Sequence, residues 1–428
     1  MRKPLALKIK ILLLTGCALF FVKFVFFSEK PSPPETAAPC PPATSPFPSY
    51  DEAFAPTARW CLENPNGQIF QLSQNYAEAE EQPSEKLAWK QIARTPDELK
   101  IKWKEYLLAV LDYAYEGNLE TDWVVQRNLK RKWFHAPWMH AGVTGREFMR
   151  GLTVERPSCE KELVEGKVCD DDKLPIENWA VSVYNAPGAF YIGQVWTEML
   201  KRNPNPKNFP ASGFPEGTVA VKLLFTQAET QFLKRTVVWQ ADIYRGKMPA
   251  QKMRLLQVDV SVRDNVSPTG WVFGTFIYHD DAPPIPYPVE LPPDKKSWLK
   301  LVPLGLMFGN EPAQSVLNSD VPVPQHFGCR QRLNGPVDNP KSSCLACHAQ
   351  SEVPMDLNFD RLNLTYPPMS CDERTNEFWF KNVNPRSDKE SERTISAPDK
   401  KTVSLDFSLQ LREGIERCCQ AKNACQCK

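Results

Sequence analysis

Near the carboxyl end of the chain, residues 344–348 are Cys-Leu-Ala-Cys-His, which has the spacing Cys-x-x-Cys-His. This spacing attaches a c-type haem, because two thiols three residues apart can add to the two vinyl groups of one porphyrin. The histidine that follows is held beside the iron as its proximal ligand. The motif therefore predicts one covalent haem c, bound through Cys344 and Cys347, with His348 on the iron.

Three other roles for this motif remain open from the sequence. The cysteines can form half of a zinc site, a redox-active Cys-x-x-Cys pair, or one arm of a disulfide. An export signal at the amino terminus of the same chain favours the haem.

The export signal consists of basic residues, from Arg2 to Lys10, followed by an apolar run over residues 11–27 that only Lys23 interrupts. The run is at the short end of the length that spans a bilayer. A basic start keeps the amino terminus in the cytoplasm and sends the rest of the chain across the membrane. No small-x-small cleavage residues follow Phe27. We therefore expect residues 1–27 to be a retained signal anchor in the inner membrane, with a cleaved signal peptide as the alternative.

Residues 14–17, Leu-Thr-Gly-Cys, also resemble the lipobox of bacterial lipoproteins. Cleavage before Cys17 would leave an apolar run at the new amino terminus, whereas lipoproteins usually continue with polar residues. All three interpretations place the body of the protein in the periplasm.

The composition agrees with an exported protein. The formal net charge of the 428 residues is +1, so nothing indicates nucleic acid as a partner. Thirteen cysteines are typical of an oxidising compartment. Cys159 and Cys169 flank a polar loop and predict a local disulfide. Further disulfides are expected among Cys329, Cys371, Cys418, Cys419, Cys425 and Cys427, although the tail cysteines can also bind a metal.

The chain divides into five parts. After the anchor, residues 28–56 are rich in proline and predict a semi-rigid polyproline II spacer. Residues 57–170 are mainly helical in character, residues 171–293 have the alternating pattern of strands, and residues 294–428 form a loop-rich haem-binding region with a cysteine-rich tail.

The helical part contains a clear start signal. Residues 95–98, Thr-Pro-Asp-Glu, combine a capping box with proline at the first helical position. Apolar residues then recur at helical spacing as far as Ala114, and Gly117 is the natural end. Residues 133–140 form a cluster of aromatic residues and histidines, which we expect in a packed core rather than in a haem pocket.

The strand part predicts an antiparallel sheet or partial barrel. Val258, Val260 and Val262 alternate with polar residues, which indicates a half-buried strand. The connections lack a helical period, so βαβ units are not expected. The other expected strands are 179–184, 218–225, 237–244 and 270–278. Residues 297–307 are expected to form a short helix. The predicted fold class is therefore α+β.

Three stretches together resemble a known family of bacterial haem proteins. They are residues 214–222 (Phe-Pro-Glu-Gly-Thr-Val-Ala-Val-Lys), residues 269–273 (Thr-Gly-Trp-Val-Phe) and the motif at 344–348. The family is the β-sheet c-type cytochromes, which include the hydroxylamine-oxidising cytochrome with a lysine-crosslinked haem and the beta-type cytochrome c-prime. The resemblance covers roughly residues 179–350, and the wider pattern also resembles uncharacterised exported monohaem proteins of bacteria.

The resemblance implies that a mostly antiparallel sheet covers the haem. It carries Cys344 and Cys347 over as attachment residues and His348 as the proximal ligand. Lys222 is a lysine on one of the matching strands, but the resemblance does not assign it the crosslink.

These observations support three hypotheses about function. The first is a membrane-tethered periplasmic monohaem cytochrome that transfers electrons to or from an unidentified redox partner protein. The second is a haem enzyme or gas-binding protein with an open sixth iron position, for which the resemblance implies oxidation of a small nitrogen compound. The third is an exported binding or scaffold protein whose cysteine motif holds zinc or disulfides.

The sixth iron ligand distinguishes the first two hypotheses. Met369 follows two prolines and lies twenty-one residues after His348, which gives it ample reach to the far face of the haem. Met355 would have to wrap around the porphyrin edge within seven residues, or about 23 Å of extended chain. His326 and His140 compete with Met369, and an open position is the remaining alternative.

Overall fold

The computed structural model describes residues 70, 73–77, 79–80, 86–136, 146–167, 169, 175–196, 204–244, 248–321, 328–353, 371, 379–395 and 402–420. The expected anchor and proline-rich spacer lie outside these residues. Within the described ranges, no helix combines the length and the apolar character needed to cross a membrane.

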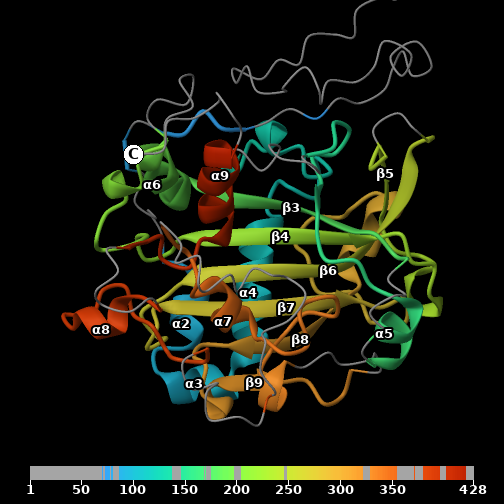
Figure 1. The fold of residues 1–428 in the computed structure, drawn as a ribbon. Coiled ribbons are helices and arrows are strands. Elements are labelled where there is room, and N and C mark those ends of the chain that lie inside the picture. Colours follow the sequence, from blue (N-terminus) through green and yellow to red (C-terminus); the bar gives the residue numbers. More distant parts are fainter. Residues whose placement is uncertain are drawn as a thin grey trace, which may run out of the picture.

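One large antiparallel sheet organises the fold (Figure 1). Its strand order is β1-β3-β4-β6-β7-β8-β9, with β2 beside β3 and β5 beside β6, and all the pairings are antiparallel. The strands are β1 (Trp133–His135), β2 (Thr153–Val154), β3 (Asn178–Asn185), β4 (Val219–Thr226), β5 (Val238–Ala241), β6 (Gln251–Arg263), β7 (Trp271–Tyr278), β8 (Leu301–Met307) and β9 (Ser315–Leu317). A separate pair joins β10 (Glu352–Val353) to β11 (Val403–Ser404). The predicted α+β class and antiparallel sheet are thus confirmed.

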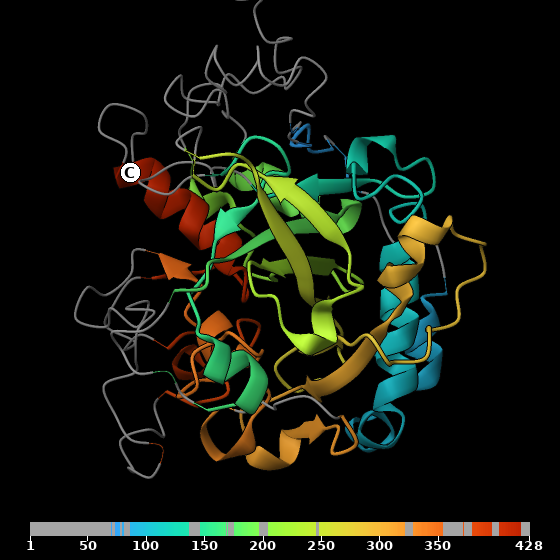
Figure 2. The same cartoon turned by 90° about the vertical axis from the view of Figure 1, so that its right-hand side faces the viewer.

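Helices lie on both faces of the sheet. The α-helices are α2 (Ala88–Ile92), α3 (Pro96–Ile101), α4 (Trp103–Tyr115), α5 (Glu160–Glu165), α6 (Ala186–Val195), α7 (Cys344–His348), α8 (Glu390–Arg393) and α9 (Leu409–Gln420). The 3₁₀ helices are η2 (Val125–Arg127), η4 (Pro206–Asn208), η5 (Gln231–Leu233), η6 (Pro293–Leu299), η7 (Pro312–Gln314) and η8 (Cys329–Gln331). In the side view, α4 and α9 lie on opposite sides of the sheet (Figure 2).

The predicted helix after Thr95 is two helices in the structure. Thr95 caps α3 as expected, because its side chain accepts a hydrogen bond from the Glu98 backbone. The expected single helix is wrong at Lys102, where φ is −105° and ψ is 23°, values that end α3 before α4 begins. The apolar residues keep their helical spacing across this break. Those of α4 pack on the sheet, against β6 and β8.

Alternation along the strands divides the buried side chains into two cores. Val258, Val260 and Val262 face α4, in what we call the α4-side core. Asp259 and Ser261, between them, face the opposite side. The half-buried strand predicted from this alternation is confirmed. The opposite face carries the α7-side core, which includes Tyr184, Phe214, Trp271, Phe273, Leu345, Phe407 and Leu411.

Two further expectations differ from the structure. Residues 301–307 form strand β8, paired with β7, instead of continuing the expected helix. Pro303 and Gly305 explain the difference, because both are unfavourable inside a helix. Strands β1 and β2 come from the part expected to be mainly helical and join the same sheet. Within the aromatic cluster, Trp133 and Phe134 are buried in the α4-side and α7-side cores, as expected, while residues 137–140 lie outside the described chain.

Candidate haem site

The Cys-x-x-Cys-His motif forms its own short helix, α7. Ser343 precedes the helix, and its Oγ accepts a hydrogen bond from the Ala346 backbone at 3.1 Å. Side chains three and four positions apart lie on the same face of a helix. Cys344, Cys347 and His348 therefore share one face of α7, and Leu345 packs on the other side into the α7-side core.

This face of α7 borders a cavity of about 230 Å³ between the helix and the sheet. Alternate residues of the strands form its floor, which includes the small side chains of Ser182 on β3, Ala220 on β4 and Ser261 on β6. Ala220 and Ser261 are direct partners in the ladder between β4 and β6. A larger side chain at any of these positions would take up part of the cavity.

Aromatic side chains also line the cavity. Tyr184 and Trp271 lie toward one end, and Phe273 and Phe407 lie beside His348. The ring centroids of Phe273 and His348 are 4.8 Å apart. Aromatic walls around a histidine give the low-polarity surroundings in which a porphyrin ring packs.

A backbone hydrogen bond fixes the orientation of His348. Its Nδ1 lies 2.7 Å from the carbonyl oxygen of Phe407. A carbonyl only accepts hydrogen bonds, so Nδ1 carries the proton and donates, and Nε2 keeps its lone pair. Burial lowers the pKa of His348 to about 4, although the bond to Phe407 acts in the opposite direction. His348 is therefore a neutral imidazole at pH 7, the form that binds metal, and its second nitrogen has the carbonyl partner typical of metal-bound histidine.

The two thiols of the motif remain unpaired in a chain that otherwise forms disulfides. Among the cysteines whose side chains are described, Cys344 and Cys347 are the free ones. Cys159 is bonded to Cys169, which confirms the predicted local disulfide. Cys329 is bonded to Cys371, and Cys418 is also part of a disulfide.

The protonation of these thiols argues against a redox pair. Burial raises the pKa of Cys344 well above its usual value and that of Cys347 to about 11. Redox-active Cys-x-x-Cys pairs have lowered thiol pKa values, since the thiolate is the reactive form. The Cys347 thiol also lies 2.8 Å from the Ser342 hydroxyl.

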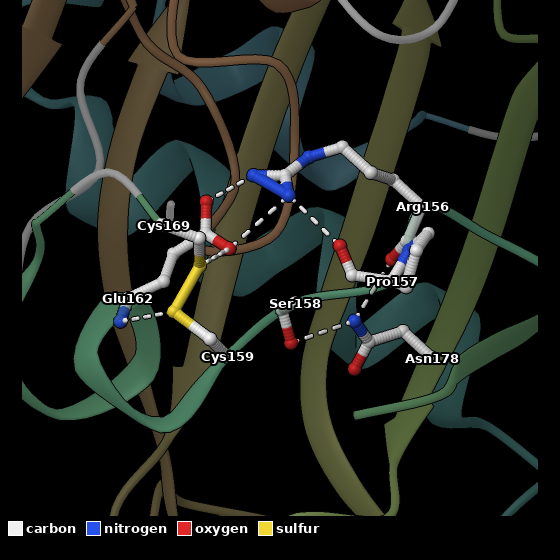
Figure 3. The surroundings of a disulfide bond; sticks show 7 residues. All are labelled: Arg156, Pro157, Ser158, Cys159, Glu162, Cys169 and Asn178. Atoms are coloured by element: carbon white, nitrogen blue, oxygen red, sulfur yellow. Dashed lines mark hydrogen bonds and ion pairs between the residues drawn. A yellow bond between two sulfur atoms is a disulfide. The ribbon is translucent and has the colours of Figure 1, made fainter. Parts of the chain in front are cut away.

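Within the described part of the chain, the motif residues do not belong to a group of ligand atoms that could hold zinc. A zinc ion needs ligand atoms that converge on one point. Among the described residues, the one group of three or more possible ligands that converges is Cys159, Glu162 and Cys169. There the two sulfur atoms are bonded to each other, and Arg156 pairs with Glu162 beside them (Figure 3).

Charged residues line the cavity on the sheet side. Lys222 Nζ lies 3.2 Å from Asp259 Oδ2 and 4.0 Å from Glu155 Oε2. Burial acts to lower the pKa of Lys222, but Glu155 and Asp259 outweigh it and hold the pKa well above its usual value. Lys222 is therefore an ammonium without a lone pair for iron. Thr275 steadies Asp259 by donating a hydrogen bond at 2.8 Å.

The four candidate sixth ligands lie outside the described residues: Met369, Met355, His326 and His140. Of the described residues that line the cavity, His348 is the only histidine, and no methionine is among them. The structure thus brings Cys344, Cys347 and His348 together and leaves Met369 untested.

Two features of the site were absent from the sequence-based prediction. Ser343 carries a recognisable signal, because a serine directly before a short helix is a common cap. Phe407 carries none, since its contribution is a backbone carbonyl fifty-nine residues from His348.

Comparison with known proteins identified no relative. No protein-family model, no curated protein and no solved structure matches the chain.

Proposed function

We propose that this protein is a membrane-tethered periplasmic monohaem c-type cytochrome that transfers electrons. Cys344 and Cys347 bind the haem, His348 is the proximal iron ligand, and Met369 is the candidate sixth ligand. One observation carries the proposal: the Phe407 carbonyl fixes the His348 ring with Nε2 available, on the helix face that also presents two free thiols. When bound, the haem iron supplies a one-electron couple between its ferric and ferrous states.

The chain's own residues hold and shield this group. Ser343 caps the helix that spaces the two thiols. Phe273 and Phe407 pack beside His348 and keep water from its ring. The small floor residues leave room for the porphyrin plane, while the N-terminal anchor and spacer keep the body near redox partners at the inner membrane.

The test is covalent haem after expression in the periplasm together with a haem-attachment system. We expect haem staining on denaturing gels and a pyridine haemochrome spectrum for one haem per chain. Cys344→Ala with Cys347→Ala should abolish both signals. The matched control is Cys159→Ala with Cys169→Ala, which also removes two cysteines and should keep the haem. Covalent haem that persists in the first variant, or none in the wild type, overturns the proposal.

A second candidate function is a haem enzyme or gas-binding protein with an open sixth position. The described wall of the cavity favours it, since that wall offers the Lys222–Asp259 ion pair but no second histidine or methionine. By resemblance, its substrate class is a small nitrogen compound. Rapid stoichiometric binding of carbon monoxide to the reduced protein would select this function. A protein that purifies with zinc and without haem would select the binding or scaffold alternative instead.

A further inference from the structure

The carbonyl that holds His348 belongs to a turn with an unfavourable backbone. Asp406 and Phe407 have φ values of 46° and 66°, in the left-handed region that residues other than glycine rarely adopt. Two such residues in succession persist only where the surroundings hold them, and such positions cluster at functional sites. The turn aims the Phe407 carbonyl at His348 Nδ1.

A buried carboxylate holds this turn. The Asp406 side chain is fully buried and accepts three hydrogen bonds from three different segments. The donors are Trp271 Nε1 at 2.9 Å, Arg386 Nη1 at 2.8 Å and the Phe214 backbone at 2.8 Å. Trp271 lies on β7 and lines the cavity, so the same carboxylate ties the turn to the cavity wall.

Arg386 links Asp406 to the connection between β6 and β7. Its Nη2 donates to the Thr269 carbonyl at 2.8 Å while Nη1 binds Asp406. Gly213 and Gly270 have positive φ values and leave room for these two side chains: a Cβ on either glycine would collide with Asp406 or Arg386. The fork geometry of a guanidinium suits this double role, which a lysine cannot reproduce.

We propose that Asp406 and Arg386 are positioning residues for the proximal iron ligand. They hold the turn at residues 406–407, so that the Phe407 carbonyl stays in line with His348 Nδ1 and fixes both the ring orientation and the tautomer. A hydrogen bond of this kind makes the imidazole a stronger electron donor to the metal. The inference rests on the proposed function, in which His348 binds haem iron.

A purely electrostatic role for the pair makes a different prediction. Loss of the Asp406 negative charge near the haem would raise the reduction potential, and loss of the Arg386 positive charge would lower it. Positioning predicts a rise for both variants, because weaker donation from His348 destabilises ferric iron. Arg386→Lys separates the two most clearly: it keeps the charge, so electrostatics predicts no shift, whereas positioning predicts a rise.

The experiment compares the haem-loaded wild type with Asp406→Asn, Arg386→Gln and Arg386→Lys. The control is Asp280→Asn, because Asp280 is also a buried carboxylate with an arginine partner, Arg235, but follows the end of β7 opposite to Trp271. The first measurement is the reduction potential. The second is hydrogen exchange of the His348 Nδ1 proton, followed by NMR on reduced protein made diamagnetic by its own sixth ligand or by carbon monoxide.

We expect exchange at least tenfold faster, and a higher potential, in all three variants but not in the control. Unchanged exchange, or potential shifts of opposite sign for Asp406→Asn and Arg386→Gln, overturns the inference. If Asp406→Asn does not fold, the two Arg386 variants decide the question by themselves. A wild type without covalent haem would instead refute the proposed function, so the two failures are distinguishable.

Discussion

Lys222 and Asp259 are direct partners in the ladder between β4 and β6, and their charged groups meet 3.2 Å apart at the wall of the cavity. Glu155 lies 4.0 Å from the same ammonium. The lysine is thus a positive charge with a carboxylate on either side of it at the cavity wall.

Loss of this lysine should destabilise the fold. Lys222→Met leaves the Asp259 carboxylate without the ammonium that lies 3.2 Å from it, and an unpaired buried charge is costly. Since the Lys222 and Asp259 side chains keep about a fifth of their exposure, we expect a loss of about 1–3 kcal/mol in the free energy of unfolding, measured with urea. Lys104→Met is the control, because its pair with Asp320 at 3.9 Å is exposed. If both substitutions lower the free energy of unfolding by the same amount, the Lys222–Asp259 pair stabilises the fold no more than an exposed ion pair does.

Glu162 should make stability depend on pH. Burial raises its pKa to about 7, although Arg156 acts to lower it (Figure 3). A carboxyl group with a raised pKa binds its proton more tightly in the folded state, so its contribution is fully present below its ordinary pKa, near pH 4.5, and is lost as pH rises toward 7. We expect the free energy of unfolding to fall by about 2–3 kcal/mol across this window.

The measurement for Glu162 is urea unfolding at pH 5 and pH 7.5. Glu162→Gln should flatten the difference between the two conditions. Glu165→Gln is the control on the same helix, since Lys167 lowers the pKa of Glu165 and that group is exposed. A pH dependence that survives in Glu162→Gln would assign the effect to another group.

The Cys159–Cys169 disulfide should stabilise the fold without affecting the haem. It closes a loop with a sequence separation of 10, for which chain entropy predicts about 2–3 kcal/mol. The variant with alanine at both positions should lose this amount in urea unfolding and keep its haemochrome spectrum. Loss of haem from the folded variant would mean that this disulfide supports the haem site.

Met369 is tested by the spectrum of the oxidised protein. If the first hypothesis is right, a weak sulfur-to-iron band appears in the near infrared, and Met369→Ala abolishes it. Met355→Ala is the matched control and should leave the band in place. Rapid carbon monoxide binding by the reduced wild type would exclude a methionine ligand and indicate the open site.

The predicted membrane anchor is tested by finding on which side of the membrane the body of the protein lies. Reporter fusions at Ser49 should be active for an enzyme that folds only in the periplasm and silent for one that works only in the cytoplasm. The reverse pattern would invert the predicted orientation.

Local signals in the sequence predicted the parts of the fold that depend on local physics. Thr95 caps α3, as its side-chain hydroxyl and the capping box predict. Val258, Val260 and Val262 face the same core because side chains alternate along a strand. The spacing of Cys344, Cys347 and His348 likewise predicted that they act together, and in the structure all three line one cavity, although the helix α7 that carries them was not predicted.

Features set by distant parts of the chain were not predictable. The break at Lys102 leaves the apolar period unchanged, so no periodicity reveals it. The carbonyl of Phe407 reaches His348 because Asp406 is held from three segments, and no local pattern encodes such a contact.

The Cys329–Cys371 disulfide determines how far one candidate ligand can move. Both cysteines belong to the apolar cluster that contains Ala346 of helix α7, and Cys329 Sγ lies 3.2 Å from the Lys341 carbonyl oxygen just before that helix. Met369 precedes Cys371 by two residues, so its Cα stays within about 7 Å of the Cys371 Cα. In the proposed cytochrome, this tether would hold the Met369 thioether near the iron at a high effective concentration that does not depend on the concentration of the protein. Reduction of the Cys329–Cys371 disulfide would then lengthen the tether and weaken binding of the sixth ligand.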